Sequence, residues 1–335
     1  MRENSLSYDF SDEFIKFTDY VKSADFDIPD PAFPSLGFRN KRGDLSFPSL
    51  GFKMETSRGK SEALNLTLAW DKEIAVSSNQ GVDPLEWIGR KPKYYGKSVK
   101  IAVIDSGCNS TESYNFVASS SSSADEIQKG HGTHVKWIIQ RISPHAEVIN
   151  AKVADGNGSV NLSRVICALI WAATKKAHIA NLSLSLTMPV NAEAISVYKN
   201  LLGRLFYDKN LLVFCGIGKR SVERADSRNK VQPINRFSIL AYSDYCVKVS
   251  AVNKDGVSIY NPTIKTYPVN CAGLYYVQTP SRTFDGYSAA CPVASAAYAL
   301  FLEKNKGDFY RALSEFYKCC QNPAFGVGRG FVRSP

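Results

Sequence analysis

Apolar runs rich in valine and isoleucine recur along the chain from about residue 95. They lie at 99–104, 148–153, 179–186, 211–217 and 247–252. Runs of this length and composition are typical of strands buried on both faces of a parallel sheet. Helical patterns lie between several of them, at 133–142, 162–176 and 192–207. Strands that alternate with helices predict an α/β fold, with a doubly wound, mostly parallel sheet flanked by helices.

The first 94 residues lack this alternation, and we predict that they form an N-terminal extension ahead of a domain at 95–335. The sequence FPSLGF occurs twice in the extension, at 33–38 and 47–52, and basic residues follow each copy. Two copies are too few for a solenoid. Two interpretations stay open: a flexible segment with two short recognition or cleavage sites, or a duplicated linker without a role. One strand is expected at 64–70.

Composition narrows the class of protein. Hydrophobic residues make up 44% of the chain and charged residues 21%, which excludes a mainly disordered, collagen-like or coiled-coil protein. The longest uninterrupted apolar stretch that we find, 165–173, has nine residues. A membrane-spanning helix needs about 20, so we expect no membrane span.

The net charge of +10 is unevenly distributed, because residues 1–30 carry −5 and the remainder +15. Basic surfaces attract nucleic acids. However, the sequence has no known nucleic-acid-binding motif, so we expect lysines on a solvated surface and regard nucleic acid as an unlikely partner.

Eight cysteines are present, and several, such as Cys167 and Cys215, stand in apolar contexts. Buried free thiols are common in reducing compartments. The adjacent Cys319 and Cys320 lack metal-site spacing and nearby histidines, so no zinc site is expected. The first residues carry charges where a signal peptide has an apolar core. These features predict a cytoplasmic protein.

Asp105 ends the first apolar run of the regular region. In doubly wound sheets, ligands and catalytic groups gather at the carboxyl ends of the strands. A carboxylate buried there needs a hydrogen-bond partner, and a histidine N–H is one candidate. Taken alone, such an aspartate is weak evidence, since many only cap a loop.

The segment GHGTHV at 130–135 carries two of the four histidines. A zincin motif needs a spacing of four and a glutamate after the first histidine, and neither is present. Glycines on both sides of His131 leave its ring room to approach a substrate, which favours it as the general base. His134, His145 and His178 are expected to be structural.

Ser288 opens a helical stretch crowded with small residues, at 287–300. Small side chains let a helix lie close to a sheet, and its N-terminal N–H groups face developing negative charge. We expect Pro292 to fall in the first turn, where its missing N–H costs little. In isolation, Ser288 is explained better as a plain N-cap of a core helix.

Together, Asp105, His131 and Ser288 follow the chain order Asp, His, Ser. The segments VIDSG at 103–107, HGTHV at 131–135 and GYSAACP at 286–292 resemble the three motifs of the subtilisin-like serine proteases, the subtilases. The third departs from the family's Gly-Thr-Ser-Met-Ala-x-Pro at Tyr287 and Ala289. The resemblance covers roughly residues 95–331.

This resemblance implies a serine endopeptidase that hydrolyses peptide or protein substrates through an acyl-enzyme intermediate. Asp105, His131 and Ser288 would be catalytic. Substrate would lie extended along residues 183–186, and Ser183, Leu184, Ser185 and Gly216 would bind it. The chemistry would require no cofactor or metal. Family members often bind structural calcium, for which the sequence assigns no ligands.

One position departs from the family in a way that bears on activity. An asparagine that donates to the oxyanion is expected where this chain has Ile217, which has no side-chain donor. Losing such a donor costs about 10² to 10³ in turnover. Lys219, two residues later, is a candidate substitute. The departure leaves an alternative open: a weak or inactive pseudoprotease that binds peptides or a partner.

Overall fold

The computed structural model describes most of the second part of the chain. The described ranges are 81–89, 93–117, 122–127, 130–160, 162–184, 192–217, 238–241, 243–257, 269–321 and 329–335, together with short strands at 38–39, 45–47, 52–54 and 66–67.

Seven strands form the central sheet, in the order β12-β11-β10-β9-β5-β7-β6. All their pairings are parallel. In chain order they are β5 (Lys100–Asp105), β6 (Ser113–Asn115), β7 (Glu147–Lys152), β9 (Ile179–Leu182), β10 (Leu212–Gly216), β11 (Cys246–Val252) and β12 (Cys271–Leu274). The strand order reverses at β5, which lies between β7 and β9. Such a switch point is where doubly wound sheets bind ligands, and Asp105 lies at its carboxyl end.

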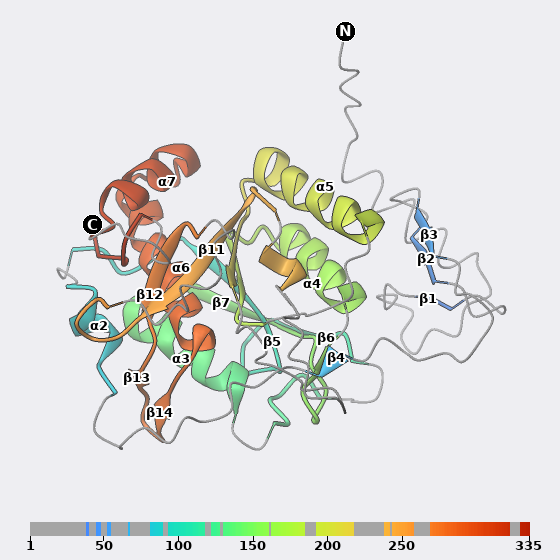
Figure 1. Cartoon of the computed structure of the whole chain (residues 1–335), viewed down its shortest axis with the longest axis horizontal. Coiled ribbons are helices and arrows are strands. Elements are labelled where there is room, and N and C mark those ends of the chain that lie inside the picture. Colours follow the sequence, from blue (N-terminus) through green and yellow to red (C-terminus); the bar gives the residue numbers. More distant parts are fainter. Residues whose placement is uncertain are drawn as a thin grey trace, which may run out of the picture. The chain divides into compact units, whose positions relative to one another are not determined.

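Helices lie on both faces of this sheet (Figure 1). On one face, α3 (His131–Ile142) packs against α6 (Tyr287–Lys304), which also contacts α7 (Phe309–Lys318). On the other, α4 (Leu162–Thr174) packs beside α5 (Ala192–Lys209). A short helix, α2 (Pro84–Trp87), contacts α3. The fold is therefore the doubly wound α/β architecture that the sequence predicts.

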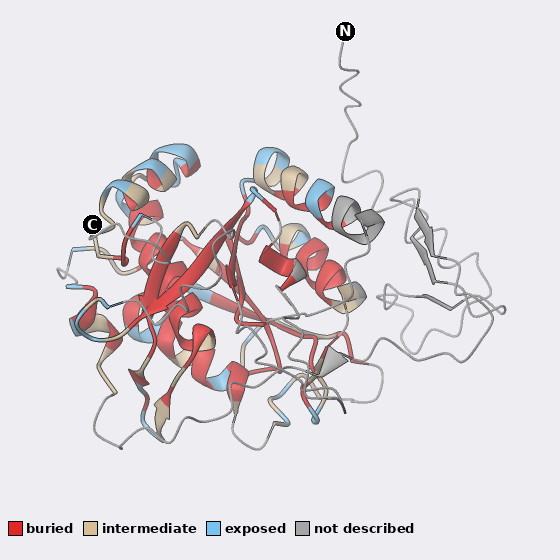
Figure 2. Cartoon of the chain, in the orientation of Figure 1, coloured by how far each residue is buried: buried red, intermediate tan, exposed pale blue. Residues whose placement is uncertain are grey.

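The helix α6 lies in the centre of the core (Figure 2). Its alanines and other small residues are almost all buried, and it contacts β9, β10, β11 and β12. The approach is close enough that a side chain at Gly273 of β12 would meet the carbonyl oxygen of Ala290 at 2.1 Å. Ser288 is thereby held against the sheet by a helix that packs along most of its length.

Every strand and helix predicted in the regular region is present, with ends that differ by a few residues. The apolar run at 179–186 continues past the strand itself, which ends at Leu182. The strands β6 and β12 and the helix α7 were not predicted. The first two are short, at three and four residues, so their periodicity gives little signal.

The chain divides into two units, Met1–Asn65 and Leu66–Pro335. A boundary near residue 95 stays a prediction. In the first unit, β1 (Phe38–Arg39), β2 (Leu45–Phe47) and β3 (Phe52–Met54) form an antiparallel sheet. Phe47 and Phe52, the two ends of the second FPSLGF copy, are partners in its register. Most other residues of both copies lie outside the described residues.

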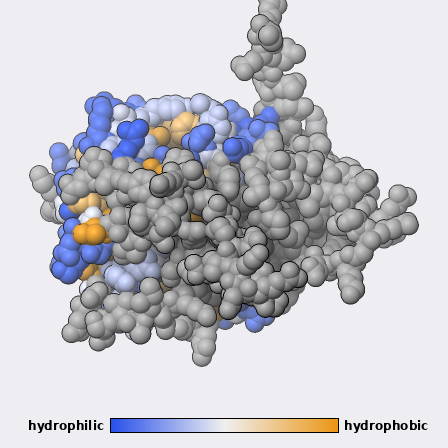
Figure 3. Space-filling model, viewed as in Figure 1, coloured by the Kyte–Doolittle hydropathy of each residue, from blue (hydrophilic) through white to orange (hydrophobic). Residues whose placement is uncertain are grey.

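In the second unit, β4 (Leu66–Thr67) pairs antiparallel with β8 (Ser159–Val160), which places a strand inside the predicted 64–70 segment. No described helix has the length and hydropathy needed to cross a bilayer. On the face seen in Figure 3, the described surface is largely hydrophilic, with small separate hydrophobic spots.

Candidate active site

Asp105 and His131 form a buried hydrogen-bonded pair. Asp105 is the last residue of β5 and His131 the first of α3, and Nδ1 of the imidazole lies 2.7 Å from Oδ1 of the carboxylate. The side chains are almost completely buried. The backbone N–H of Ser106 also donates to Oδ1 (2.7 Å), while Oδ2 has no hydrogen-bond partner among the described residues. Among the described residues, the imidazole and the Ser106 N–H are thus the groups that meet this buried carboxylate.

Two glycines allow this pair to form. A side chain at Gly132 would lie 2.2 Å from the carbonyl oxygen of Gly107, so only glycine fits where α3 starts against the end of β5. Gly107 itself has a φ of +110°, which side chains rarely adopt. The glycines of the two sequence motifs therefore bring the strand end and the helix start into contact.

Ser288 is the second residue of α6 and is partly exposed. Its hydroxyl donates to the backbone carbonyl of Ser183 (3.1 Å). A hydroxyl has one proton to donate, so in this conformation the proton is directed at Ser183 and not at an imidazole. Before Ser288 can donate to His131, its hydroxyl must give up the bond to the Ser183 carbonyl.

Pro292 corrects one expectation. It lies inside α6, past the first turn, and not where its missing N–H would cost little. In a regular helix the N–H of this residue would bond to the carbonyl of Ser288, four residues earlier. The proline removes that bond and places its ring against the same carbonyl, so the helical hydrogen bonding is interrupted at Ser288.

A series of buried hydrogen bonds connects α6, the helix of Ser288, to the end of β9. Ser295 Oγ donates to Asn181 Oδ1 (3.0 Å), and Asn181 Nδ2 donates to Ser183 Oγ (3.0 Å). Cys291, one turn after Ser288, places its Sγ 3.6 Å from the Leu182 carbonyl oxygen. Burial raises the pKa of the Cys291 thiol well above its usual value, so it stays protonated. These contacts connect α6 to the end of β9.

Phe284 contacts both histidines of α3. Its ring meets His131 edge-on and stacks on His134, with centroids 5.2 and 5.1 Å apart. His134 Nε2 accepts a hydrogen bond from Arg282 Nε (3.2 Å). His134 is thus occupied in packing the hairpin of β13 (Val277–Gln278) and β14 (Thr283–Phe284) onto the helix.

The predicted substrate segment is only partly described. Ser183 and Leu184 follow β9 directly and are buried. Gly216 is the last residue of β10. A Cβ at this position would lie 3.2 Å from the Cβ of Tyr287, so Gly216 packs against the residue that precedes Ser288. Ile217 is 3% exposed, and its backbone N–H donates to Val249. Ser185 and Lys219 lie outside the described residues.

One acidic and one basic residue near the Asp105–His131 pair were not predicted: Asp125 and Lys152. Asp125 accepts hydrogen bonds from Ser106, one residue after Asp105, and from Thr133, two residues after His131. Lys152 ends β7 and pairs in register with Asp105. A lysine inside the apolar run at 148–153 was the available signal, because a charge in a buried strand must have partners.

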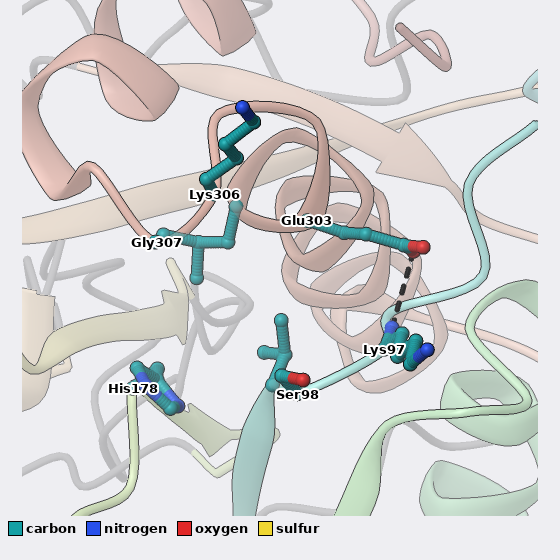
Figure 4. Close-up of a pocket in the computed structure, with 8 residues that line it drawn as sticks. Lys97, Ser98, His178, Glu303, Lys306 and Gly307 are labelled. Atoms are coloured by element: carbon teal, nitrogen blue, oxygen red, sulfur yellow. Dashed lines mark hydrogen bonds between the residues drawn. The ribbon is translucent and has the colours of Figure 1, made fainter.

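The opposite edge of the sheet contains a pocket of about 410 Å³, lined by His178, Glu303, Lys306 and residues 97–99 among others (Figure 4). His178 Nδ1 accepts the backbone N–H of Lys100 (3.0 Å). Burial, and then the charge of Lys100, lower the pKa of His178. His145 stacks on Tyr95 at 5.0 Å. His145 precedes β7 and His178 precedes β9, so both lie at the amino ends of the strands, whereas the Asp105–His131 pair lies at the carboxyl ends.

The doubly wound sheet with Asp, His and Ser in this chain order is the arrangement of the subtilisin-like class. The chain matches the model described as "Subtilase family" over residues 96–315. This match covers more than half of the sequence, and the chain belongs to the subtilase family.

Curated relatives include two proteases of Bacillus subtilis (strain 168). "Minor extracellular protease Epr" is 29% identical over 233 residues, which are 64% of this chain and 33% of that protein. "Major intracellular serine protease" is 26% identical over 248 residues, or 66% of this chain and 73% of that protein. The chain thus spans about a third of the length of the first of these relatives.

Among solved structures, a lanthipeptide protease superposes with a TM-score of 0.60 at 17% identity, covering 80% of this chain and 97% of that one. A cold-adapted subtilisin-like serine proteinase superposes with a TM-score of 0.50 at 19% identity. At these identities the likeness establishes the fold, and that fold is the subtilisin-like one.

Proposed function

We propose that this protein is a serine endopeptidase that cleaves peptide bonds through an Asp105–His131–Ser288 triad. The observation that carries the proposal is the buried contact between Asp105 Oδ1 and His131 Nδ1, 2.7 Å long. In a serine triad, Nδ1 of the histidine bonds to the carboxylate and Nε2 takes the proton of the nucleophile, so this contact puts Nδ1 in its expected role. Membership of the subtilase family and the named activities of the relatives support the same assignment.

In the proposed reaction, Ser288 Oγ bonds to the substrate carbonyl carbon and its proton passes to His131 Nε2. The imidazolium gives that proton to the leaving amine as the C–N bond breaks, which leaves an acyl-enzyme. Water then attacks the ester, His131 takes its proton, and the acid product leaves with Ser288 restored. Asp105 stabilises the positive imidazolium in both halves. The chain supplies each group, so no cofactor or metal is needed for the chemistry.

The oxyanion is proposed to bind at the start of α6. As the second residue of the helix, Ser288 has a backbone N–H without an acceptor inside the helix, and the helix dipole adds to its effect. Ile217 offers neither a side-chain donor nor a spare backbone N–H. Lys219 is the proposed substitute. If the Lys219→Met variant turned over as fast as the wild type, that substitution would be wrong.

The pseudoprotease alternative rests on Ile217, whose apolar side chain is packed in the core. Proteomic cleavage profiling of the purified full chain, beside its Ser288→Ala variant, separates the two functions. An endopeptidase produces new peptide termini that the variant does not. Identical termini in both samples would contradict the proposed activity and leave peptide binding.

We also propose that the protein works in a reducing compartment, the cytoplasm. All eight cysteines are free, six of them buried. Cys215 Sγ donates a hydrogen bond to Cys246 Sγ (3.5 Å), and the two cysteines form no disulfide. One relative is named an intracellular protease. The proposal fails if protein isolated from cells under acid quenching, then unfolded, has lost thiols to disulfides.

A further inference from the structure

A completely buried lysine ends the strand beside Asp105. Lys152 is the last residue of β7, its Cα pairs in register with that of Asp105, and its side chain is 0% exposed. A buried ammonium is costly unless ionic and hydrogen-bonding partners surround it. The partners of Lys152 therefore identify the part of the chain that this buried charge stabilises.

Three contacts of Lys152 Nζ lead to one loop, residues 122–127. Nζ donates to the carbonyl oxygens of Ser122 and Ala124 (both 3.1 Å) and pairs with Glu126 Oε2 (2.7 Å). Carbonyl and carboxylate oxygens that converge on one point are the ligands of a hard cation. At this loop the cation is the chain's own ammonium.

The next inward residue of β7 on the same face strengthens this attachment. Asn150 Nδ2 donates to the carbonyl oxygen of Ser123 (2.8 Å). Three consecutive carbonyls of the 122–127 loop are therefore bound by two side chains of β7. The loop also packs tightly on the turn after Asp105, because a Cβ at Gly107 would meet the Ala124 oxygen at 2.5 Å.

The 122–127 loop in turn connects the two elements that carry the catalytic pair. Asp125 Oδ1 accepts from Ser106 Oγ (2.9 Å), and Oδ2 accepts from Thr133 N (2.9 Å) and Thr133 Oγ1 (3.1 Å). Ser106 Oγ accepts from the backbone N–H of Gly132 (2.9 Å). One carboxylate thus bridges the residue after Asp105 and the first turn of α3.

This bridge places two carboxylates close together. Burial, opposed by the bond from Thr133 and assisted by the charge of Asp105, raises the pKa of Asp125. The charges of Asp125 and Asp105 repel each other. The ammonium of Lys152 attracts the same loop from the β7 side, through two carbonyl oxygens and Glu126. A neutral side chain at position 152 would leave the loop without this attraction.

We propose that Lys152 is a positioning residue for the Asp105–His131 pair, acting through the 122–127 loop and Asp125. It does not touch the reacting atoms; it holds the loop that fixes the end of β5 and the start of α3 relative to one another. The catalytic part of this inference rests on the proposed function. A misplacement of about 1 Å in such a pair costs roughly 10² in turnover.

A second buried lysine provides a matched control. Lys248 of β11 is 4% exposed, and its Nζ pairs with Asp244 Oδ1 (3.1 Å), whose side chain is 90% exposed. It lies in the same sheet, three strands from β5. Lys152→Met and Lys248→Met remove the same charge from equally buried places, but only the first removes a contact with the 122–127 loop.

The test compares both variants with the wild-type full chain in two measurements. For Lys152→Met we expect kcat on a peptide substrate to fall about 10²-fold with KM nearly unchanged. We also expect the low-field proton resonance of His131 Nδ1–H to broaden or vanish in the NMR spectrum. Lys248→Met should retain both. If Lys152→Met does not fold, Asp125→Asn, which keeps the buried lysine and its loop carbonyls, should produce the same two changes.

The resonance separates this inference from the proposed function, because it requires no turnover. An inactive wild type with a low-field resonance that Lys152→Met abolishes would contradict the peptidase and support the positioning role. A variant that keeps the wild-type resonance, or an active variant that keeps the wild-type kcat, would overturn the role of Lys152. Equal losses in Lys248→Met would overturn it as well, since they would mark a general effect of removing a buried charge.

Discussion

The two edges of the central sheet each contain a buried or half-buried histidine, and the difference lies in what each Nδ1 meets. At the carboxyl edge, His131 Nδ1 faces the carboxylate of Asp105. At the amino edge, His178 Nδ1 accepts a backbone N–H, and Lys100 lies nearby. A carboxylate stabilises the imidazolium that proton transfer creates, whereas a lysine opposes it. Of these two histidines, His131 has the surroundings that the proposed general base requires.

The comparison also shows that a pocket does not by itself mark a catalytic site. The pocket of about 410 Å³ lies at the amino edge. Its carboxylate, Glu303, accepts hydrogen bonds from the backbone N–H groups of Tyr95, Gly96 and Lys97, at 2.5, 2.6 and 3.1 Å. Figure 4 shows the bond from Lys97. That glutamate holds a turn in place, while Asp105 holds an imidazole. The same functional group has two roles because its donors differ.

The largest expected effect separates the two histidines. His131→Ala removes the proposed general base, so kcat/KM on a peptide should fall by about 10⁴-fold or more. His178→Ala should stay within about threefold of the wild type, since its contacts serve the strand start. Steady-state kinetics on both variants measure the contrast. Comparable losses in the two would break the distinction between the edges.

Replacing the carboxylates sharpens the same contrast. Asp105→Asn should lower kcat by about 10⁴-fold, because an amide neither fixes the tautomer of His131 nor stabilises its cation. Glu303→Gln should leave kcat unchanged and lower thermal stability, since it weakens three charge-assisted hydrogen bonds. Kinetics and thermal unfolding of both variants are the measurements. A fall in kcat for Glu303→Gln would contradict the assignment of roles.

How much of this was predictable from sequence differs between the sheet and the site. Long apolar runs such as 211–217 predict strands, because strands buried on both faces are apolar along their whole length. The apolar run that ends at Asp105, and the glycines on both sides of His131, predicted a site at the carboxyl ends of the strands. Pro292 was misplaced because an N-terminal helix boundary is hard to locate when no side-chain cap marks it, and Gly286 provides none.

The supporting residues escaped prediction for a different reason. Asp125 lies in an irregular serine-rich loop, where no periodicity indicates which side chain turns inward. Its role depends on contacts with Ser106 and Thr133, which come from two other segments. Likewise, the bond from Ser288 to the Ser183 carbonyl joins residues 105 positions apart. Such long-range pairs are set by packing and not by local pattern.

The smallest expected effect concerns stability and pH. The pKa of His178 lies below its usual value in the folded chain, so the unfolded chain binds a proton more readily. Folding stability should therefore fall as the pH drops through about 6.5, and His178→Asn should weaken that fall. Thermal unfolding at pH 7.5 and pH 5.5 tests this, with His145→Asn as the control. A pH dependence identical in wild type and His178→Asn would contradict the environment assigned to His178.

The claim on which the account depends is that Ser288 is a nucleophile activated by the Asp105–His131 pair. The most direct test is labelling of the full chain with a fluorophosphonate, followed by mass spectrometry of the modified peptide. The account predicts a single adduct on Ser288, lost in Ser288→Ala and strongly slowed in His131→Ala. No adduct on the folded wild-type protein, or labelling at the same rate in His131→Ala, would contradict it.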